Sequence, residues 1–184
     1  METDHGSVRI TYTPATPIGV FRPSSGTWFY HDGATYLEGE TVTFGTAGDL
    51  PVPGDYNGDG YAEPAVFRSS NGYWFIHDGP TVQFGTSGDI PVRGDYNGDS
   101  VTERAVFRPS NGYWFVEGGE VAQYGTSGDI PVPFDGDGDG DTDMAVFRPS
   151  NGYWFLRFGP TVPFGTSGDW PIPLPSAIRQ AFFP

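Results

Sequence analysis

Three stretches of this sequence gather carboxylates at a regular spacing. They read Asp-Tyr-Asn-Gly-Asp-Gly-Tyr-Ala-Glu at 55–63, Asp-Tyr-Asn-Gly-Asp-Ser-Val-Thr-Glu at 95–103 and Asp-Gly-Asp-Gly-Asp-Gly-Asp-Thr-Asp at 135–143. The three stretches hold three, three and five of the 23 acidic residues in a chain of 184 residues with a formal net charge of −14. Carboxylates packed this closely repel one another unless a cation binds between them.

The shared pattern predicts a calcium loop. Side-chain oxygens fall at positions 1, 3, 5 and 9 of each stretch, and position 7 can offer its backbone carbonyl. Ca²⁺ takes about six to eight oxygen ligands, and the spacing is close to the EF-hand scheme with its last acid moved nearer. The loops contain no His or Cys, which argues against Zn²⁺ and Cu²⁺. Asx-turns alone are the alternative, because Asp, Asn and Gly dominate turns, but three loops with the same oxygen positions favour metal.

The loops belong to an internal repeat about 40 residues long. Self-similarity predicts four copies, and the first copy carries six extra residues within 31–41. Gly-Thr-Ser/Ala-Gly-Asp begins at Gly45, Gly85, Gly125 and Gly165. Val-Phe-Arg begins at Val20, Val66, Val106 and Val146.

Each repeat predicts four short β-strands, and the chain as a whole is expected to be all-β. In the copy from Ile90 to Asp129 we expect strands over 90–96, 104–108, 113–117 and 121–124, with an Asn-Gly hairpin turn before Tyr113. Runs such as Ala145-Val146-Phe147 and Trp154-Phe155-Leu156 are apolar on both faces. Such strands are expected in a sheet packed between two other sheets.

The two ends of the repeat region complement each other. The first copy starts at 18–22 without the leading strand of the others, and residues 169–174 supply a strand of that type after the last copy. We therefore predict a four-bladed β-propeller closed by pairing of its N- and C-terminal strands. An open stack that other subunits cap or continue is the alternative.

The loops, each followed after one residue by Ala-Val-Phe-Arg and preceded by Phe-Gly and Gly-Asp, resemble the FG-GAP (VCBS-like) repeats of the integrin-alpha-type β-propeller. That resemblance, over about 18–174, implies about three Ca²⁺ per chain, each in the loop between the first two strands of a blade. The ligands it implies are Asp55, Asn57, Asp59, Tyr61 and Glu63; Asp95, Asn97, Asp99, Val101 and Glu103; and Asp135, Asp137, Asp139, Asp141 and Asp143. Tyr61, Val101 and Asp141 would contribute backbone carbonyls.

Two segments lie outside the repeats, which gives three parts: an arm at 1–17, the propeller at 18–174 and a tail at 175–184. Within the arm, residues 7–13 alternate apolar and polar side chains as a strand does. Such a surplus strand can pair with an exposed sheet edge, so we expect 7–13 to link copies into a homo-oligomer or filament. Packing of the arm on its own blade, which would leave the protein a monomer, is the alternative.

The rest of the sequence narrows the function. The acidic charge argues against nucleic acid or anionic lipid as a partner, and no apolar stretch is long enough for a membrane helix. No signal peptide is visible at the start. There is no Cys, no Lys, no nucleophile elbow and no phosphate-binding loop, so no enzymatic activity is expected.

Other recurring side chains are interpreted as structural. Arg22, Arg68, Arg108 and Arg148 each follow Phe, and we expect each to pair with a repeat Asp and to stack on a Trp. Four ligand-binding arginines are the alternative.

The sequence favours a non-catalytic, extracellular or cell-surface calcium-binding module for recognition or adhesion of a protein or glycan. A structural subunit that assembles through its terminal arms and a lectin-like carbohydrate-binding module are the alternatives. Among the loops, 135–143 is expected to bind calcium most tightly because it has most acids. Loop 95–103 is expected to bind it most weakly, because Ser100 replaces a turn glycine.

Overall fold

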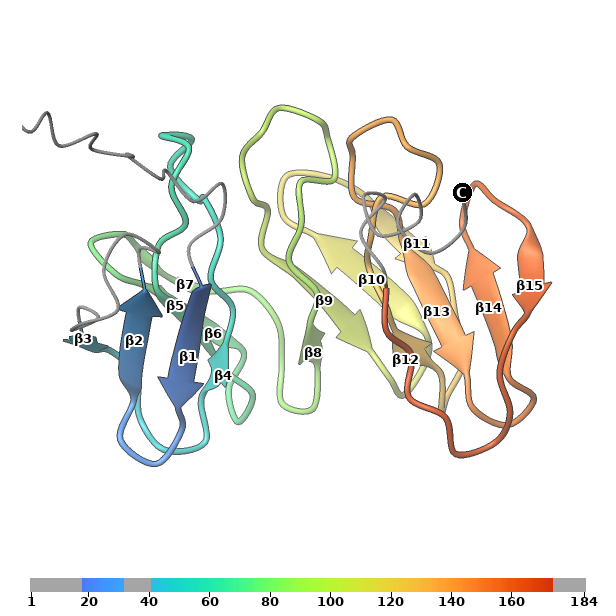
Figure 1. The fold of residues 1–184 in the computed structure, drawn as a ribbon, viewed down its shortest axis with the longest axis horizontal. Coiled ribbons are helices and arrows are strands. Elements are labelled where there is room, and N and C mark those ends of the chain that lie inside the picture. The colour runs from blue at the N-terminus through green and yellow to red at the C-terminus, as the bar shows by residue number, and fades with distance from the viewer. Residues whose placement is uncertain (1–17, 32–40, 174–184) are drawn as a thin grey trace, which may run out of the picture. The chain divides into compact units, whose positions relative to one another are not determined.

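The computed structural model describes residues 18–31 and 41–173 of the chain (Figure 1). The chain divides into two compact units, Met1–Ala47 and Gly48–Pro184. The predicted arm 1–17, with its strand at 7–13, and the predicted tail 175–184 lie outside the described residues. No helix in the described ranges is long and apolar enough to cross a membrane.

The regular elements of the described residues are all β-strands, which confirms the all-β prediction. The first unit holds an antiparallel sheet of three strands in the order β1-β2-β3. These strands are β1 (Ile18–Arg22), β2 (Thr27–His31) and β3 (Thr41–Thr43).

The second unit holds three antiparallel sheets of four strands each, and each sheet corresponds to one sequence repeat. Equivalent residues pair in each sheet: Leu50 with Phe67, Ile90 with Phe107 and Ile130 with Phe147. The strands are β4 (Leu50–Pro51), β5 (Ala65–Arg68), β6 (Tyr73–Ile76), β7 (Thr81–Gln83), β8 (Ile90–Pro91), β9 (Ala105–Arg108), β10 (Tyr113–Val116), β11 (Val121–Gln123), β12 (Ile130–Pro131), β13 (Ala145–Arg148), β14 (Tyr153–Leu156) and β15 (Thr161–Pro163).

The hairpin between β9 and β10 turns where the Asn-Gly pair predicts. Gly112 N donates to Arg108 O at 2.9 Å, and the φ of Gly112 is 72°. A β-carbon at Gly112 would lie only 2.2 Å from Gly125 O, so glycine is required for space as well as for backbone conformation. The same close approach recurs in the neighbouring sheets.

The first strand of each repeat is shorter than predicted. We expected a strand over 90–96, but β8 ends at Pro91. Pro91 has no N–H to donate to the ladder, and beyond it the pairing continues only through Val92 N to Ala105 O at 2.8 Å and an isolated bridge between Gly94 and Glu103. The chain then leaves the sheet as the acidic loop.

Neighbouring sheets of the second unit pack face to face. Val106 of β9 joins the buried cluster of the preceding sheet, which contains Phe67 and Trp74, and Val146 of β13 joins the cluster around Phe107 in the same way. This packing explains why Val106 and Val146 are each only 1% exposed although they face away from the tryptophans of their own sheets. Burial on both faces is confirmed for Ala145–Phe147, whereas Trp154–Leu156 in the last sheet is only half-buried.

Three of the four recurring arginines, Arg68, Arg108 and Arg148, form structural pairs with a repeat Asp, as predicted, but their aromatic partner is different. Arg68 Nε and Nη2 donate to the two oxygens of Asp49 at 2.8 and 2.9 Å. The guanidinium lies over Phe75, 4.4 Å from the ring centroid, and not over a tryptophan. Arg68 pairs with Tyr73 across the strands, so Phe75 shares its face while Trp74 points to the other. The prediction of Trp stacking was therefore wrong.

The described sheets are propeller-like in their repetition, and they form no closed barrel. Ring closure and a count of four blades are therefore treated as proposals below.

Candidate metal centre

The three acidic loops occupy equivalent places, between the first and second strands of each four-stranded sheet. An isolated backbone bridge closes the base of each loop and fixes its last acid. The bridges join Gly54 to Glu63, Gly94 to Glu103 and Phe134 to Asp143.

The inward side chains of loop 55–63 accept hydrogen bonds from its own backbone. Asp55 Oδ1 accepts from Gly58 N at 2.6 Å, and Asp55 Oδ2 accepts from Gly60 N at 2.8 Å. Asn57 Oδ1 accepts from Asp59 N at 2.8 Å. Asp59 Oδ1 accepts from Tyr61 N at 2.9 Å. These bonds turn positions 1, 3 and 5 toward the inside of the loop, as the sequence pattern predicts. Each carboxylate oxygen keeps a further lone pair for a cation.

The glutamate that ends the loop turns back to the same centre. Glu63 Oε2 accepts from Tyr56 N at 2.8 Å, and Glu63 Oε1 accepts from Asn57 Nδ2 at 2.8 Å. Glu103 makes the same two contacts in the second loop, at 2.7 and 2.9 Å. The last acid is thus held beside position 3 in both loops.

Each loop brings three carboxylates together, with one oxygen from each within 4.8 Å of the others. This spacing suits shared coordination of one hard cation. The third loop differs, because Asp137 occupies the position of Asn57, while Asp143 is bonded to Gly136 N at 2.9 Å. The clusters are Asp55, Asp59 and Glu63; Asp95, Asp99 and Glu103; and Asp135, Asp137 and Asp139.

The second loop has a strained backbone position. Gly60 and Gly140 have φ values of 88° and 102°, in the left-handed region that glycine tolerates. Ser100 occupies the same place in the second loop with a φ of 69°. A side chain in this region costs about 1–2 kcal/mol.

The loops hold their charges unequally. Desolvation raises the pKa of Asp55, but backbone N–H donors from the loop outweigh it and leave the pKa below its usual value. Desolvation raises the pKa of Asp141, and repulsion from Asp139 and Asp95 raises it further. Desolvation raises the pKa of Glu103, and repulsion from its neighbours Asp99 and Asp95 raises it further. The frame of loop 55–63 therefore favours the ionised form of Asp55, whereas Asp141 and Glu103 lie next to carboxylates that repel them.

Adjacent loops are joined directly. Thr102 N donates to Asp55 O at 2.6 Å, and Thr142 N donates to Asp95 O at 2.5 Å. The side chain of Asp141 lies against the second loop, because a β-carbon at Gly98 would be 2.3 Å from Asp141 Oδ1. Asp141 was predicted only as a backbone ligand of its own loop, so this contact was missed.

Two tyrosines that the sequence interpretation left aside anchor the first two loops. The hydroxyl of Tyr56 donates to Val52 O at 2.7 Å, and Tyr96 bonds to Val92 O in the same way. Burial raises the pKa of Tyr56, so the phenol stays a neutral donor. The recurrence of Tyr at position 2 of the first two loops could have indicated this role, and the third loop has Gly136 at that position.

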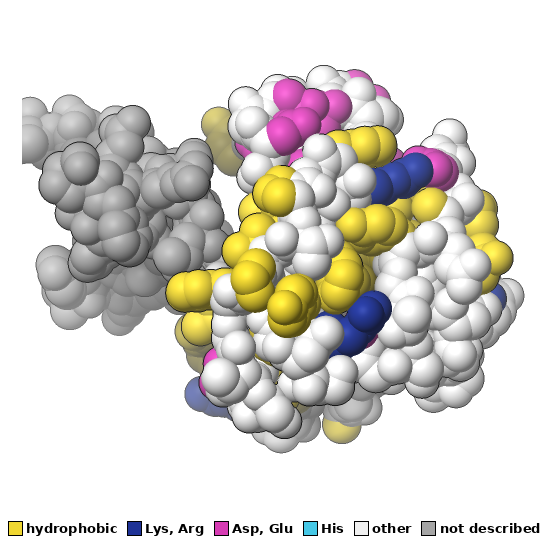
Figure 2. All heavy atoms as spheres, turned by 90° about the vertical axis from the view of Figure 1, so that its right-hand side faces the viewer, with side chains coloured by type: hydrophobic (Ala, Val, Ile, Leu, Met, Phe, Trp, Pro, Cys, Tyr) yellow, Lys and Arg dark blue, Asp and Glu magenta, His cyan; other side chains and the backbone are white. Residues whose placement is uncertain are grey.

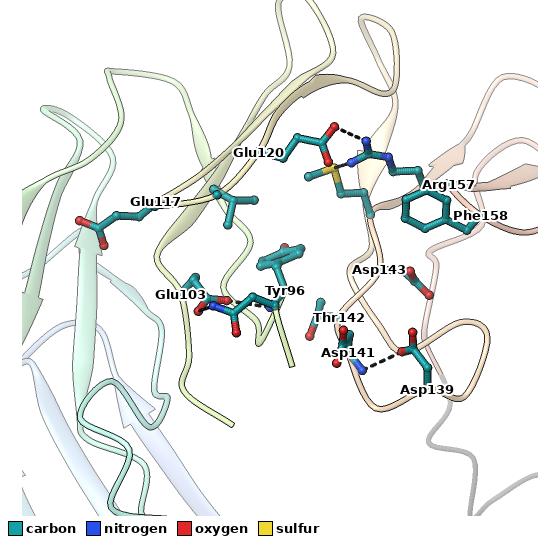
Figure 3. Close-up of a pocket in the computed structure, with 15 residues that line it drawn as sticks. Tyr96, Glu103, Glu117, Glu120, Asp139, Asp141, Thr142, Asp143, Arg157 and Phe158 are labelled. Atoms are coloured by element: carbon teal, nitrogen blue, oxygen red, sulfur yellow. Dashed lines mark hydrogen bonds and ion pairs between the residues drawn. The ribbon is translucent and has the colours of Figure 1, made fainter. Parts of the chain in front are cut away.

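A cavity of about 250 Å³ opens beside the second and third loops (Figure 3). Asp139 and Asp141 line one end of it, and Glu120 and Arg157, which form an ion pair, line the other. The ring of Phe158, 73% exposed, stands next to Arg157. The cavity therefore combines carboxylates, one cation and an exposed aromatic face.

Comparison of the chain with protein-family models, with curated proteins and with solved structures found no match.

Proposed function

We propose that this protein is a non-catalytic calcium-binding β-repeat protein of the FG-GAP type that acts outside the cell in recognition or adhesion. The observation that carries the proposal is the recurrence of one three-carboxylate cluster at the same place in three sheets. Exposed, oxygen-only loops of this kind suit the millimolar calcium of the extracellular space, where modules bind with dissociation constants of roughly 10⁻⁴–10⁻³ M.

The turn-only alternative accounts for part of the geometry. Asx-type bonds such as Asp59 N to Asn57 Oδ1 form in turns without any metal. They do not require an acid at position 9, yet Glu63 folds back to bring a third carboxylate into the cluster. Bringing like charges together costs free energy, and a divalent cation offsets that cost.

In this proposal the chain holds calcium through positions 1, 3, 5 and 9, with the carbonyl of position 7 as a further ligand. The ion supplies positive charge that neutralises the gathered carboxylates. The hydrogen-bond frame orients the ligands, and the bridge between Gly54 and Glu63 fixes the end of the loop to the start of the sheet. Ligation would thus tie the first strand of each sheet to the second.

The sheets are interpreted as propeller blades. A ring of four blades within one chain, as the sequence predicts, is one way to complete the end strands. An open stack of sheets that other subunits cap or continue is the alternative.

The proposal is tested by substitutions that keep the turn and remove the charge. Asp55→Asn, Asp95→Asn and Asp135→Asn each retain an oxygen for the N–H of Gly58 or its equivalent. We expect the full chain to bind about three Ca²⁺ by equilibrium dialysis and each variant to lose one. Asp78→Asn changes an acid that is 90% exposed and outside the loops, and should lose none. Unchanged stoichiometry in all three loop variants would refute the proposal.

The cavity beside Phe158 favours carbohydrate as a second candidate ligand. An exposed aromatic face next to carboxylates can stack on a sugar ring while the carboxylates accept hydrogen bonds from its hydroxyl groups. Phe158→Ala should abolish binding to any glycan that the full chain captures on a glycan array. Tyr153→Ala, an aromatic residue of β14 that is 37% exposed, serves as the control. If the two variants bind alike, the cavity is not a sugar site.

A further inference from the structure

The three acidic loops lie at one end of the second unit and contact one another in sequence order (Figure 1). Figure 2 shows Asp and Glu side chains gathered at this end. Each contact joins position 8 of one loop to position 1 of the loop before it. Thr102 N donates to Asp55 O at 2.6 Å, and Thr142 N donates to Asp95 O at 2.5 Å. Neighbouring loops are therefore joined at residues that belong to the candidate ligand sets or lie next to them.

The peptide group that makes each contact also carries a candidate calcium ligand. The N–H of Thr102 and the carbonyl of Val101 belong to one trans peptide, whose planarity makes them point in opposite directions. Because the N–H points at Asp55, the carbonyl of Val101 points away from the preceding loop. The peptide between Asp141 and Thr142 is held in the same way. The preceding loop thus fixes the direction of the carbonyl at position 7.

The accepting side of each contact leads to the last acid of the preceding loop. Asp55 O, which accepts from Thr102 N, belongs to the same peptide group as Tyr56 N. Tyr56 N donates to Glu63 Oε2 at 2.8 Å, and the equivalent bond in the second loop is 2.7 Å long. Hydrogen bonds in such a series polarise one another. Two peptide groups therefore connect position 7 of one loop with position 9 of the loop before it.

The space at each junction is made by a glycine. A β-carbon at Gly54 would lie 2.7 Å from Thr102 Cγ2, and one at Gly94 would lie 2.6 Å from Thr142 Cγ2. Neither glycine has a left-handed backbone. Glycine is therefore required at these two places because the threonine of the next loop needs the room.

The outer ends of the series lack this pair of residues. No acidic loop precedes the first one, and its position 8 is Ala62 where the others have threonine. No acidic loop follows the third one, and Phe134 stands where the others have Gly54 and Gly94. The ring of Phe134 instead packs edge-on against Trp154, with centroids 6.5 Å apart. The threonine–glycine pair thus occurs only where two loops meet.

We propose that Thr102 and Thr142 are positioning residues that couple the loops, so that calcium bound in one loop raises the calcium affinity of its neighbour. This inference rests on the proposed function, because it takes the loops as calcium sites. When ligation holds Asp95 in place, its carbonyl holds the peptide between Asp141 and Thr142, and the third loop has one ligand already oriented. A site that is already ordered loses less conformational entropy on binding. Coupling between sites typically changes affinity by about 5–150-fold, and it is reciprocal.

A double-mutant cycle on the full chain tests the coupling between the second and third loops. The amide of Gly138, which donates to Asp135 Oδ1 at 2.6 Å, reports calcium binding to the third loop in an NMR titration. Asp95→Asn empties the second loop but keeps its backbone carbonyl, and Gly94→Ala forces the junction apart. At about 0.15 M salt, which screens repulsion between neighbouring ions, Asp95→Asn should weaken binding at the third loop. The loss should be at least about fivefold greater in the unaltered background than in the Gly94→Ala background. The removed charge is common to both backgrounds and cancels.

The matched control for this cycle is Gly54→Ala. It disturbs the junction between the first two loops and should leave the coupling between the second and third unchanged. If Asp95→Asn has the same effect in all three backgrounds, the loops bind independently and the inference is wrong, while the proposed function stands. If the Gly138 signal does not respond to calcium up to about 10 mM, well above the affinity of the weakest extracellular modules, both are wrong.

Amide hydrogen exchange tests the junction without altering it. In Asp135→Asn the third loop should be empty, so that calcium fills the second loop beside it. Adding calcium should then slow exchange of the Thr142 N–H at least about fivefold, because ligation of the second loop holds the acceptor Asp95 O. Tyr153 N, which donates to Asn151 Oδ1 at 3.1 Å beyond the other end of β13, is the control amide and should change less. Equal slowing at both amides, or none at Thr142, would overturn the proposal.

Discussion

Loops 95–103 and 135–143 share one backbone frame but gather their charge differently. In both, positions 1, 3 and 5 accept hydrogen bonds from the following N–H groups. The second loop completes its cluster with Glu103, and the third completes it with Asp137 instead. The comparison shows that the spacing of short polar residues fixes the turn, whereas the residues at positions 3 and 9 decide which carboxylates meet.

The largest effect is expected when metal is removed from all loops at once. A ligand that binds only the folded state contributes about 2.7 kcal/mol per site when its concentration is 100 times the dissociation constant. Three filled sites should therefore raise the thermal midpoint by well over 10 °C, since about 1 kcal/mol shifts a chain of this size by roughly 2–4 °C. Calorimetric melting with calcium and with chelator measures this. Equal midpoints would mean that the loops are turns only.

The next largest effect is a difference in thermal midpoint between variants of loop 95–103 and variants of loop 135–143. In calcium, Asp139→Ala should lower the midpoint more than Asp99→Ala, because the third loop has five acids for the ion and the second has three. In chelator the order should reverse, because Asp139→Ala then relieves the greater repulsion. The same calorimeter scans show both orders. A larger loss for Asp99→Ala in calcium would refute the ranking of the loops.

A smaller effect is expected from the backbone of the second loop. Ser100→Gly should stabilise the protein by about 1 kcal/mol, since Ser100 has a φ of 69°. Gly60→Ser is the matched reverse change, because a β-carbon at Gly60 meets nothing within 4 Å and only the backbone cost remains. Urea unfolding of both variants gives the two free energies. If both substitutions change the free energy of unfolding in the same direction, the difference between the loops does not lie in this residue.

The smallest effect concerns the last acid of the third loop. Asp143→Glu gives the third loop the last acid of the second, where Glu103 belongs to the cluster, and we expect calcium affinity at this loop to rise by a factor of a few, at most about 1 kcal/mol. Competition with a chromophoric chelator measures the change. Glu103→Asp, the reverse change in the second loop, should weaken binding there by a similar factor. Identical affinities in both variants and the unaltered chain would show that this length is unimportant.

The sequence predicted the repeat, the four strands of each sheet and the position of the acidic loops, because these features depend on local spacing. Val-Phe-Arg and Asn-Gly recur at fixed intervals, and each interval corresponds to one strand or one turn. The partner of Arg68 was predicted incorrectly as Trp74, although the alternation of side chains along β6 places Phe75 on the arginine's face. Cross-strand register decided that contact, and spacing within one strand does not reveal it.

Contacts between repeats were also not predictable from the sequence pattern. The side chain of Asp141 lies against the second loop, and nothing within its own nine residues indicates this. Val20 and Val106 occupy the same repeat position, yet one is 66% exposed and the other 1%. Their difference arises from the presence or absence of a preceding sheet, which is a property of the assembled structure and not of the local sequence.

The most direct test of the central claim is a calorimetric titration of the chelated full chain with Ca²⁺ and, separately, with Zn²⁺. The three clusters of carboxylate oxygens predict about three Ca²⁺ per chain, one per loop, and a preference for Ca²⁺ over Zn²⁺. Binding of one Ca²⁺ or none, or a preference for Zn²⁺, would contradict the assignment of these loops as calcium sites.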